Sequence, residues 1–361
     1  MPLAFEPGRL DTFLTRCRGL GFSGAVLVRK GDSVALHNAY GLADREHGIA
    51  NNLATQFRIG SLHKQFVAAA ILWLEGEGEL RTTDRISRYL GTLPEPKDRA
   101  TIHHLLTHTS GLIPAGTSFT SVDRDDFVSR VKELPLESLP GERFRYCNGC
   151  YGLLHAIVEL VSGEPLDEFI TKHIFGRANM PHTNYDLRLG QQRSCLAQGY
   201  EARSPRARLL TSPWARYMLA PGAFGAPVIL TPGIAQPRGW EILTGDVWST
   251  VEDLHWWDRA LHSETILARS EQQKLFVSQV GIPGSDLSYG YGWWISDTPF
   301  SRLAYHDGHY AGFESALLRY LDFDATIIVL ANTRLMTEPR TWISAIRRET
   351  EQAFRVRQTV E

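Results

Sequence analysis

Hydrophobic and polar positions follow two periods along this chain, one typical of strands and one typical of helices. Residues 8–19 have helical spacing, and residues 23–42 alternate as two strands on either side of the turn Lys30-Gly31-Asp32. The last third of the chain returns to strand patterns and ends in a helix, with elements expected at residues 289–296, 302–306, 313–320, 325–331 and 338–356. Strands are therefore expected near both ends of the chain.

The middle of the chain has a helical pattern instead. Residues 61–75 form an apolar run rich in alanine and leucine that ends at Gly76 and Gly78, which predicts a buried helix. Short helical segments then alternate with loops rich in proline and glycine, and they are expected at residues 101–107, 123–133, 151–162 and 166–173. Residues 205–240 are rich in proline and predict a long irregular segment, of a kind that is often functional.

This order of elements predicts a fold in two parts. Residues 1–80 and 240–361 would form one discontinuous α/β sandwich domain, in which strands from both ends of the chain join one sheet covered by helices. Residues 81–239 would form an inserted, mostly helical domain. Ligand sites are common in the crevice between such parts, so the active site is expected in the cleft between them.

The composition is that of an ordinary globular enzyme. Of 361 residues, 43% are hydrophobic and 22% are charged, and the formal net charge is −2, without the basic cluster that nucleic-acid binding requires. The sequence contains neither an apolar run of about 18 residues nor a signal-peptide pattern near its start. We therefore expect a cytoplasmic protein with a small-molecule substrate and without nucleic-acid or membrane partners. These features do not indicate its oligomeric state.

The start of the long apolar helix carries a candidate nucleophile. Ser61 lies where the backbone N–H groups of a first helical turn lack partners, which favours negative charge. Lys64 follows three residues later on the same helix face. A buried lysine has a lowered pKa and can accept a proton from a neighbouring hydroxyl. Only six of the 38 basic residues are lysines, so a lysine at this position is informative.

The chain contains a second Ser-x-x-Lys, at Ser129 and Lys132. It lies in the charged amphipathic segment DRDDFVSRVKEL, where an exposed serine and a solvated lysine need no chemical role. Ser61 instead begins an apolar helix, in which an unpaired Lys64 would be costly to bury. The position in the helix, rather than the pattern alone, favours Ser61.

Tyr146 and Asn148 form a second candidate group, because no other tyrosine among the twelve is followed by asparagine two residues later. They precede a helix that is expected to begin near Tyr151. Beside Lys64, Tyr146 could act as a general base, since a nearby cation favours the phenolate. Asn148 could donate its amide to a substrate. Taken alone, the segment also fits a turn with a half-buried tyrosine.

A third group, His306, Gly308 and His309, lies between two expected strands. Its glycines allow the backbone to approach a ligand closely. Taken alone, this segment has the pattern of a hairpin with surface histidines.

The three groups occur in the chain order Ser-x-x-Lys, Tyr-x-Asn and His-x-Gly. In this order they resemble the signature motifs of the serine β-lactamase and penicillin-recognising superfamily. The resemblance is greatest to the class C-related branch, with its β-lactamase-like esterases, D-amino-acid peptidases and carboxypeptidases. Matching phrases also occur at residues 57–61 (FRIGS), 104–112 (HLLTHTSGL), 153–154 (LL), 249–254 (STVEDL) and 291–294 (YGWW). The resemblance implies a β-lactamase/transpeptidase-like fold, an antiparallel sheet flanked by helices plus an inserted all-α domain.

The resemblance also implies roles for the matching residues. Ser61 would be the acylated nucleophile and Lys64 its activating partner. Tyr146 would act as the general base and then as the acid for the leaving group. No metal and no cofactor is implied.

The remaining matches would bind the substrate. Asn148 would orient its acyl side, and His306 would take the place of the cation that is usual in the third motif. The oxyanion hole would be formed by the backbone N–H groups of Ser61 and of His309, the residue after Gly308.

The third motif departs from the Lys-Thr-Gly of β-lactamases and D,D-carboxypeptidases, because this chain has His306-Asp307-Gly308. A histidine is a cation only at low pH, and Asp307 would repel a substrate carboxylate. We therefore expect a serine hydrolase of carboxylic esters or small amides. The alternatives are a D-amino-acid peptidase, carboxypeptidase or amidase, an acyltransferase such as a transesterase or peptide cyclase, and a β-lactamase or penicillin-binding sensor that is acylated once.

Cys147 and Cys150 form a Cys-x-x-Cys within the second motif. A zinc site would need further ligands, and Cys17 and Cys195 do not have the matching spacing. A redox pair is an alternative, and the interpretation that we favour is two small residues packed in a loop of a reduced protein.

Histidines and tryptophans suggest two further sites. His103, His104 and His108 lack the His-Glu-x-x-His pattern of a metal site, and the family phrase explains the last two structurally. Six tryptophans lie between residues 240 and 294, at positions Trp240, Trp248, Trp256, Trp257, Trp293 and Trp294. Most are expected in the core, with one or two from 240–248 or 293–294 lining the cleft.

Overall fold

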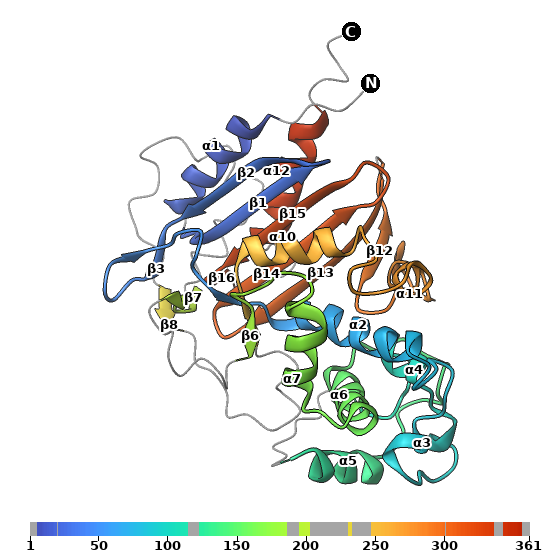
Figure 1. Cartoon of the computed structure of the whole chain (residues 1–361). Coiled ribbons are helices and arrows are strands. Elements are labelled where there is room, and N and C mark those ends of the chain that lie inside the picture. The colour runs from blue at the N-terminus through green and yellow to red at the C-terminus, as the bar shows by residue number, and fades with distance from the viewer. Residues whose placement is uncertain are drawn as a thin grey trace.

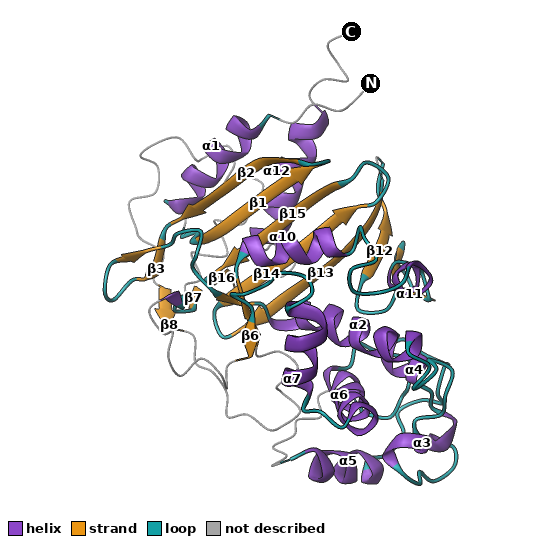
Figure 2. Ribbon diagram, viewed as in Figure 1, coloured by secondary structure: helices purple, strands orange, loops and turns teal. Residues whose placement is uncertain are grey.

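A large antiparallel sheet with helices on both faces forms the centre of the molecule (Figures 1 and 2). The computed structural model describes residues 6–19, 21–114, 123–185, 195–202, 230–232, 247–299, 301–335 and 342–355. In spatial order the sheet contains β10 (Val280–Gly281), β11 (Leu287–Tyr289), β12 (Trp294–Asp297), β13 (Arg302–Tyr310), β14 (Phe313–Tyr320), β15 (Ala325–Ala331), β1 (Gly24–Lys30) and β2 (Ser33–Tyr40).

The two ends of the chain meet where β1 pairs with β15. Gly24 lies opposite Ala331, and Lys30 lies opposite Ala325. A Cβ on Gly24 would lie 2.1 Å from the backbone oxygen of Leu330, so this close pairing requires a glycine. The prediction that both ends of the chain join one sheet is therefore confirmed, while the division into two domains at residues 80 and 240 stays a prediction.

Both faces of the sheet are buried, because alternate residues of its central strands enter two different cores. On β1, Val26 packs in the core formed with α1 (Pro7–Arg18) and α12 (Trp342–Arg355). Leu27 points to the opposite face, which is covered by α10 (Val251–Ala260). Figure 1 shows α10 lying across the sheet on one side. The near-continuous hydrophobic runs of these strands follow from this two-sided burial.

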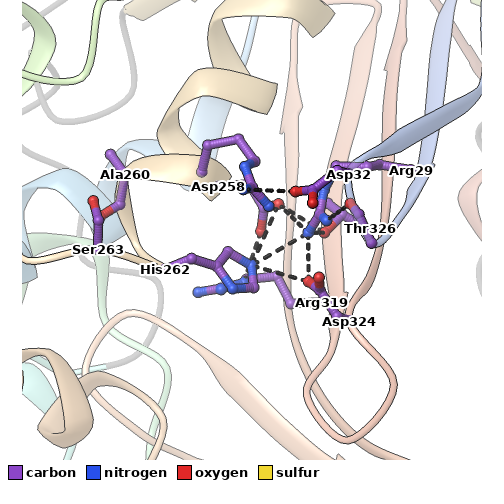
Figure 3. Close-up of polar contacts among 11 residues, drawn as sticks. Arg29, Asp32, Asp258, Ala260, His262, Ser263, Arg319, Asp324 and Thr326 are labelled. Atoms are coloured by element: carbon purple, nitrogen blue, oxygen red, sulfur yellow. Dashed lines mark hydrogen bonds and ion pairs between the residues drawn. The ribbon is translucent and has the colours of Figure 1, made fainter.

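A buried network of charged side chains fixes α10 against the sheet (Figure 3). Arg29 of β1 donates hydrogen bonds to Asp258 Oδ2 at 3.0 Å and to Asp324 Oδ1 at 2.8 Å. Arg319 of β14 contacts Asp258 Oδ1 through Nε at 2.7 Å, and the Thr326 hydroxyl donates to Asp258 Oδ2 at 2.8 Å. Such pairing offsets the cost of burying the Asp258 carboxylate. The network therefore connects α10 to β1, β14 and β15.

The rest of the molecule is mostly helical, and its elements lie mainly between residues 60 and 176. The described helices there are α2 (His63–Gly76), α3 (Ser87–Leu90), α4 (Ile102–Leu106), α5 (Arg124–Glu133), α6 (Asn148–Ser162), α7 (Leu166–Ile170) and a π-helical turn (Thr171–Phe175). A later helix, α11, spans Arg269–Leu275. Two 3-10 turns occupy Gly60–Leu62 and Lys97–Arg99. Helix α2 is buried along most of its length, as its apolar sequence predicts.

Short strands lie outside the large sheet. They form three small sheets: β3 (Leu42–Asp44) with β4 (Ile49–Ala50); β5 (Phe57–Arg58), β9 (Val247–Ser249) and β6 (Asn184–Tyr185); and β16 (Thr333–Leu335), β7 (Tyr200–Ala202) and β8 (Leu230–Pro232). The pairing of β5 with β9 brings the chain just before Ser61 beside a segment about 190 residues later.

Most of the predicted elements are present, and three differ. The single strand expected at 289–296 is wrong, because Gly292 adopts a left-handed φ of +79° and separates β11 from β12. The strand expected at 302–306 continues to Tyr310, and the helix expected from Tyr151 already begins at Asn148. The irregular segment 205–240 lies outside the described residues except for 230–232. Within the described ranges, no helix is long and apolar enough to cross a bilayer.

Candidate active site

Ser61 lies in the 3-10 turn Gly60–Leu62 that leads into α2, and strand β13 runs directly against this turn. A Cβ on Gly308 of β13 would lie 2.9 Å from the backbone nitrogen of Ser61. Gly60 adopts φ +51°, and a Cβ there would lie 3.0 Å from the backbone nitrogen of His309. These two glycines therefore bring the backbone nitrogens of Ser61 and His309 to one place.

The turn that carries Ser61 is held from two strands. The Ser315 hydroxyl of β14 donates a hydrogen bond to the backbone oxygen of Ile59 at 2.7 Å. Strand β12 pairs with β13 only as far as Tyr305, so it does not cover β13 at His309. The side chain of Ser61 is half-buried. The backbone nitrogens of Ser61 and His309 therefore lie close together beside the Ser61 side chain, where the sequence predicts the oxyanion hole.

Lys64 lies in the first turn of α2 and is 2% exposed. Its Nζ donates hydrogen bonds to Ser61 Oγ at 3.1 Å and to Asn148 Oδ1 at 2.9 Å. Burial lowers the pKa of Lys64 to about 7, and the negative charge of Asp307 acts in the opposite direction. A large fraction of Lys64 is therefore neutral at physiological pH and able to accept a proton from Ser61.

Tyr146 lies just before α6 and contacts both members of this pair. Its ring centroid is 5.1 Å from Lys64 Nζ, and its hydroxyl is hydrogen-bonded with Ser61. Burial raises the pKa of Tyr146, and the hydrogen bond with Ser61 offsets only part of this effect. The phenolate expected from the sequence is therefore not favoured, because the cost of burying its charge exceeds the stabilisation from its neighbours. Tyr146 carries its proton at neutral pH.

Asn148 is the first residue of α6, and its Oδ1 accepts the hydrogen bond from Lys64. Its side chain is otherwise exposed. The amide nitrogen of Asn148 remains available as a donor on the side of the site that faces solvent.

Cys147 and Cys150 are joined by a disulfide, with their Cα atoms 5.3 Å apart. The interpretation of two packed thiols in a reduced chain is therefore wrong, because the two sulfur atoms are bonded, and the redox-pair alternative stays a prediction. The bridge spans the first turn of α6, where Cys147 Sγ also accepts a hydrogen bond from the Cys150 N–H at 3.0 Å. It thus closes the segment that connects Tyr146 and Asn148 to the helix.

His306 is 1% exposed and lies within β13, so it is not the surface histidine that the segment alone suggested. Its Nδ1 lies 2.7 Å from the backbone oxygen of Asp307, and its Nε2 lies 3.1 Å from the Tyr289 hydroxyl. A carbonyl accepts only, so Nδ1 carries the proton and Nε2 accepts from Tyr289. Burial and the charge of Lys64 lower the pKa of His306 to about 4. His306 is therefore neutral at pH 7 and does not replace the cation of the third motif.

Asp307 is the charged member of this motif. Its side chain is 36% exposed and lies 3.5 Å from His309 Nδ1. Asp307 is thus paired with His309, and its charge also acts on Lys64 as described above. The site combines one titratable lysine with one nearby carboxylate.

Aromatic side chains form a wall beside Tyr146. The ring of Trp294 stacks on Tyr146 with centroids 6.0 Å apart and an interplanar angle of 11°. Phe144 lies 5.8 Å from Trp294. Of the other tryptophans in this region, Trp248, Trp257 and Trp293 are buried, Trp256 is 39% exposed, and Trp240 lies outside the described residues. Trp294 is the one that reaches the site, which agrees with the expectation for residues 293–294.

Two residues of this environment were not identified from the sequence. Tyr289 was noted only within a strand pattern, although it lies just ahead of the matching YGWW phrase. His108 was explained as structural, yet its ring centroid lies 4.4 Å from that of Tyr146. Neither contact has a local signal, because Tyr289 lies 17 residues before His306 and His108 lies 38 residues before Tyr146.

Comparisons with known proteins identify relatives of this chain. A family model described as Beta-lactamase matches residues 15–349. The chain is 29% identical over 283 residues to the putative penicillin-binding protein PbpX of Bacillus subtilis (strain 168), an alignment that covers 78% of this chain. The chain spans 64% of the length of that relative.

Solved structures share the fold over nearly the whole chain. D-amino acid amidase from Ochrobactrum anthropi SV3, complexed with D-phenylalanine, superposes with a TM-score of 0.78 at 19% identity and covers 96% of this chain and 98% of its own. EstCE1, a hydrolase with promiscuous acyltransferase activity, superposes with a TM-score of 0.75 at 18% identity and covers 96% and 97%. These likenesses confirm the predicted fold.

Proposed function

Because this chain belongs to the β-lactamase family, we propose that it is a serine hydrolase that forms an acyl-enzyme on Ser61 and hydrolyses carboxylic esters or small amides. The contact of 3.1 Å between Lys64 Nζ and Ser61 Oγ carries the proposal, because this lysine is buried and has a pKa of about 7. A hydroxyl with a neutral amine at hydrogen-bond distance is an activated nucleophile.

In the acylation step, Ser61 Oγ attacks the substrate carbonyl carbon while its proton passes to Lys64. The carbonyl oxygen becomes negatively charged and receives hydrogen bonds from the N–H groups of Ser61 and His309. The ammonium that forms on Lys64 is stabilised by Asn148 Oδ1 at 2.9 Å and by the charge of Asp307. Both partners strengthen their interaction as the charge develops, which lowers the barrier.

Tyr146 then acts as the acid. Its protonated hydroxyl donates to the leaving oxygen or nitrogen as the carbon–oxygen or carbon–nitrogen bond breaks, and it recovers a proton from Lys64. The starting state of the site is thereby restored with an acyl group on Ser61. In hydrolysis a water gives a proton to the same groups and attacks the ester, releasing the acid and free Ser61. In this mechanism Lys64, and not Tyr146, is the general base in acylation, while Tyr146 keeps the expected role of acid for the leaving group.

The charges of the site favour neutral substrates. His306 is neutral at pH 7, and Asp307 places a partly exposed carboxylate beside the nucleophile. A substrate carboxylate would therefore meet a negative charge, and none of the described residues named at this site supplies a fixed cation to offset it. This supports neutral esters and amides over β-lactams.

An amidase for small aromatic amides is the second candidate. The wall formed by Trp294 and Phe144 supports it, since aromatic rings pack well against one another. A neighbouring structure is a D-amino acid amidase in complex with D-phenylalanine, which agrees in substrate type. Acyl transfer to an amine or alcohol would use the same acyl-enzyme, as the acyltransferase activity of EstCE1 illustrates.

A substrate panel tests the proposal. Turnover of p-nitrophenyl butyrate, D-phenylalanine amide and nitrocefin is measured for the wild type, Ser61→Ala and the matched control Ser129→Ala. We expect the ester to be hydrolysed most readily, a loss of at least about 1000-fold in Ser61→Ala, and a Ser129→Ala variant within about twofold of the wild type. Unchanged turnover in Ser61→Ala would overturn the proposal. A preference for nitrocefin would overturn its substrate class alone.

A further inference from the structure

We propose that His108 is the positioning residue for Tyr146, an assignment that rests on the proposed function of the Ser61 site. His108 follows α4, almost 40 residues before Tyr146, yet it holds the chain on both sides of that tyrosine. Its backbone oxygen accepts a hydrogen bond from the Arg145 N–H at 2.8 Å. Its Nδ1 accepts a hydrogen bond from the Cys147 N–H at 3.1 Å. One residue thus fixes the peptide groups before and after Tyr146.

The ring of His108 also supports the ring of Tyr146 directly. The two centroids are 4.4 Å apart, and the ring of Tyr289 lies 4.7 Å from His108 on another side. His108 is 1% exposed, so the surrounding rings leave it little freedom to move. The Tyr146 ring therefore packs against a buried side chain, and the two hydrogen bonds from Arg145 and Cys147 to His108 fix the backbone that carries it.

The backbone of His108 is held in an uncommon conformation. It adopts φ +57°, in the left-handed region, where residues other than glycine are rare and asparagine, aspartate and histidine are the most frequent exceptions. This turn directs both the backbone oxygen and the side chain of His108 toward residues 145–147. A conformation of this kind persists only where surrounding contacts maintain it, and here those contacts converge on Tyr146.

The protonation of the His108 ring also supports a positioning role. Nδ1 accepts from Cys147, so the proton lies on Nε2, which is buried without a hydrogen-bond partner among the described residues. Packing alone would be served better by phenylalanine, because a buried polar atom without a partner is costly. The bond from Nδ1 to Cys147 is what a histidine supplies here. Burial and the charge of Lys64 lower the pKa of His108, which keeps Nδ1 an acceptor at neutral pH.

The position of Tyr146 matters most for the proton that it gives to the leaving group. A displacement of about 1 Å at a reacting group costs about 100-fold in rate. The contact between Lys64 and Ser61 lies within α2 and its preceding turn and does not pass through His108. Loss of the His108 contacts should therefore impair leaving-group protonation far more than nucleophilic attack.

Two esters separate these steps. The leaving group of ethyl butyrate is an alkoxide, which needs a proton. The leaving group of p-nitrophenyl butyrate is a stabilised phenolate, which does not. The variants are His108→Leu, which removes the acceptor, and the near-isosteric His108→Asn, which keeps an acceptor and tolerates the left-handed backbone. Circular dichroism and melting curves establish that each variant is folded.

We expect His108→Leu to lower kcat by about 100-fold for ethyl butyrate and by less than about 10-fold for p-nitrophenyl butyrate, with little change in KM. His108→Asn should keep the ratio of the two esters within about threefold of the wild type. If His108→Leu does not fold, a His108→Asn ratio that differs from that of the wild type by more than about threefold overturns the positioning role.

Equal losses for the two esters in a folded His108→Leu, or a His108→Asn ratio as disturbed as that of His108→Leu, would overturn the positioning role. A wild type that hydrolyses neither ester, judged against Ser61→Ala, would overturn the proposed function and this role with it. An active wild type with equal losses would overturn only the role of His108.

Discussion

Ser61 with Lys64 and Ser129 with Lys132 share one spacing and differ in everything around it. Lys64 is 2% exposed, and its Nζ is held between Ser61 Oγ and Asn148 Oδ1. Ser129 is exposed on α5, and Lys132 is half-buried on the same helix. Three residues of spacing place serine and lysine on one helix face in both segments. Only the first segment removes its lysine from water, and that removal is what lowers the lysine pKa to about 7.

The surroundings also differ in what reaches the helix. Strand β13 and the start of α6 converge on Ser61, bringing His309 and Tyr146 to it. Helix α5 packs by Phe127 and Val131 and leaves its other face to solvent. A Ser-x-x-Lys thus becomes a catalytic site through contacts made by other segments, which the four residues do not encode.

The largest expected difference between the two segments follows from removing each lysine amine. Lys64→Met should lower kcat/KM for p-nitrophenyl butyrate by about 1000-fold, because Ser61 loses its proton acceptor. Lys132→Met, the matched control, should stay within about twofold of the wild type. Steady-state kinetics of both variants check this pair. Similar rates for the two variants would remove the distinction between the segments.

Stability should change in the opposite direction to activity. A lysine whose folded pKa lies near 7, below the value of about 10.4 in unfolded chains, costs folding free energy, and this cost is fully present below pH 7 and fades as the pH rises toward 10. Lys64→Met removes the cost, so its melting temperature at pH 6 should equal or exceed that of the wild type. A clear fall in melting temperature would show that Lys64 is structural.

A smaller effect is expected from the glycine that lets β13 approach Ser61. In Gly308→Ala, a Cβ would lie 2.1 Å from the backbone oxygen of Ile59 and 2.9 Å from the Ser61 nitrogen. We expect a loss of about 1–3 kcal/mol in unfolding free energy and at least about a tenfold fall in kcat. Gly281→Ala in β10, where a Cβ would meet nothing within 4 Å, serves as the control. Denaturant titrations and kinetics of both variants measure this, and a neutral Gly308→Ala would contradict the close approach.

The main strands and the long helix could be predicted because their patterns are local. Residues 313–320 and 325–331 were predicted with the bounds that the structure has, since buried strands in a two-sided sheet read as apolar runs. The break between β11 and β12 was missed, because it depends on the left-handed φ of Gly292 against the backbone of Lys64. That contact joins residues more than 200 positions apart.

The candidate site shows the same limit. The residues of the three motifs do come together, but their protonation could not be inferred from types and spacing. Tyr146 was expected as a phenolate beside a cation, and burial instead raises its pKa while lowering that of Lys64. His306 was expected to take the place of a cation at low pH, and its burial within β13 lowers its pKa to about 4, so it is neutral at pH 7. Burial is a property of the whole fold, so it reverses assignments that proximity alone suggests.

The smallest expected effect is on pH dependence. Activity should rise with pH through about 7, because protonated Lys64 cannot accept the proton of Ser61. Asp307 raises the pKa of Lys64, so Asp307→Asn should lower it and move this acidic limb to lower pH by less than about one unit. The exposed Asp125 on α5 provides the control Asp125→Asn. Profiles of kcat/KM against pH test the shift, and a displacement to higher pH would contradict the geometry.

The site of acylation tests the central claim most directly. In separate reactions, the wild type is incubated with a fluorophosphonate or with p-nitrophenyl butyrate, and the second reaction is stopped with acid. Intact-mass measurement counts the adducts, and peptide mapping locates them. We expect one adduct per chain on Ser61, none on Ser129, no labelling of Ser61→Ala, and much slower labelling of Lys64→Met than of Lys132→Met. An adduct on another residue, or labelling that persists in Ser61→Ala, would contradict the assignment of Ser61 as the nucleophile.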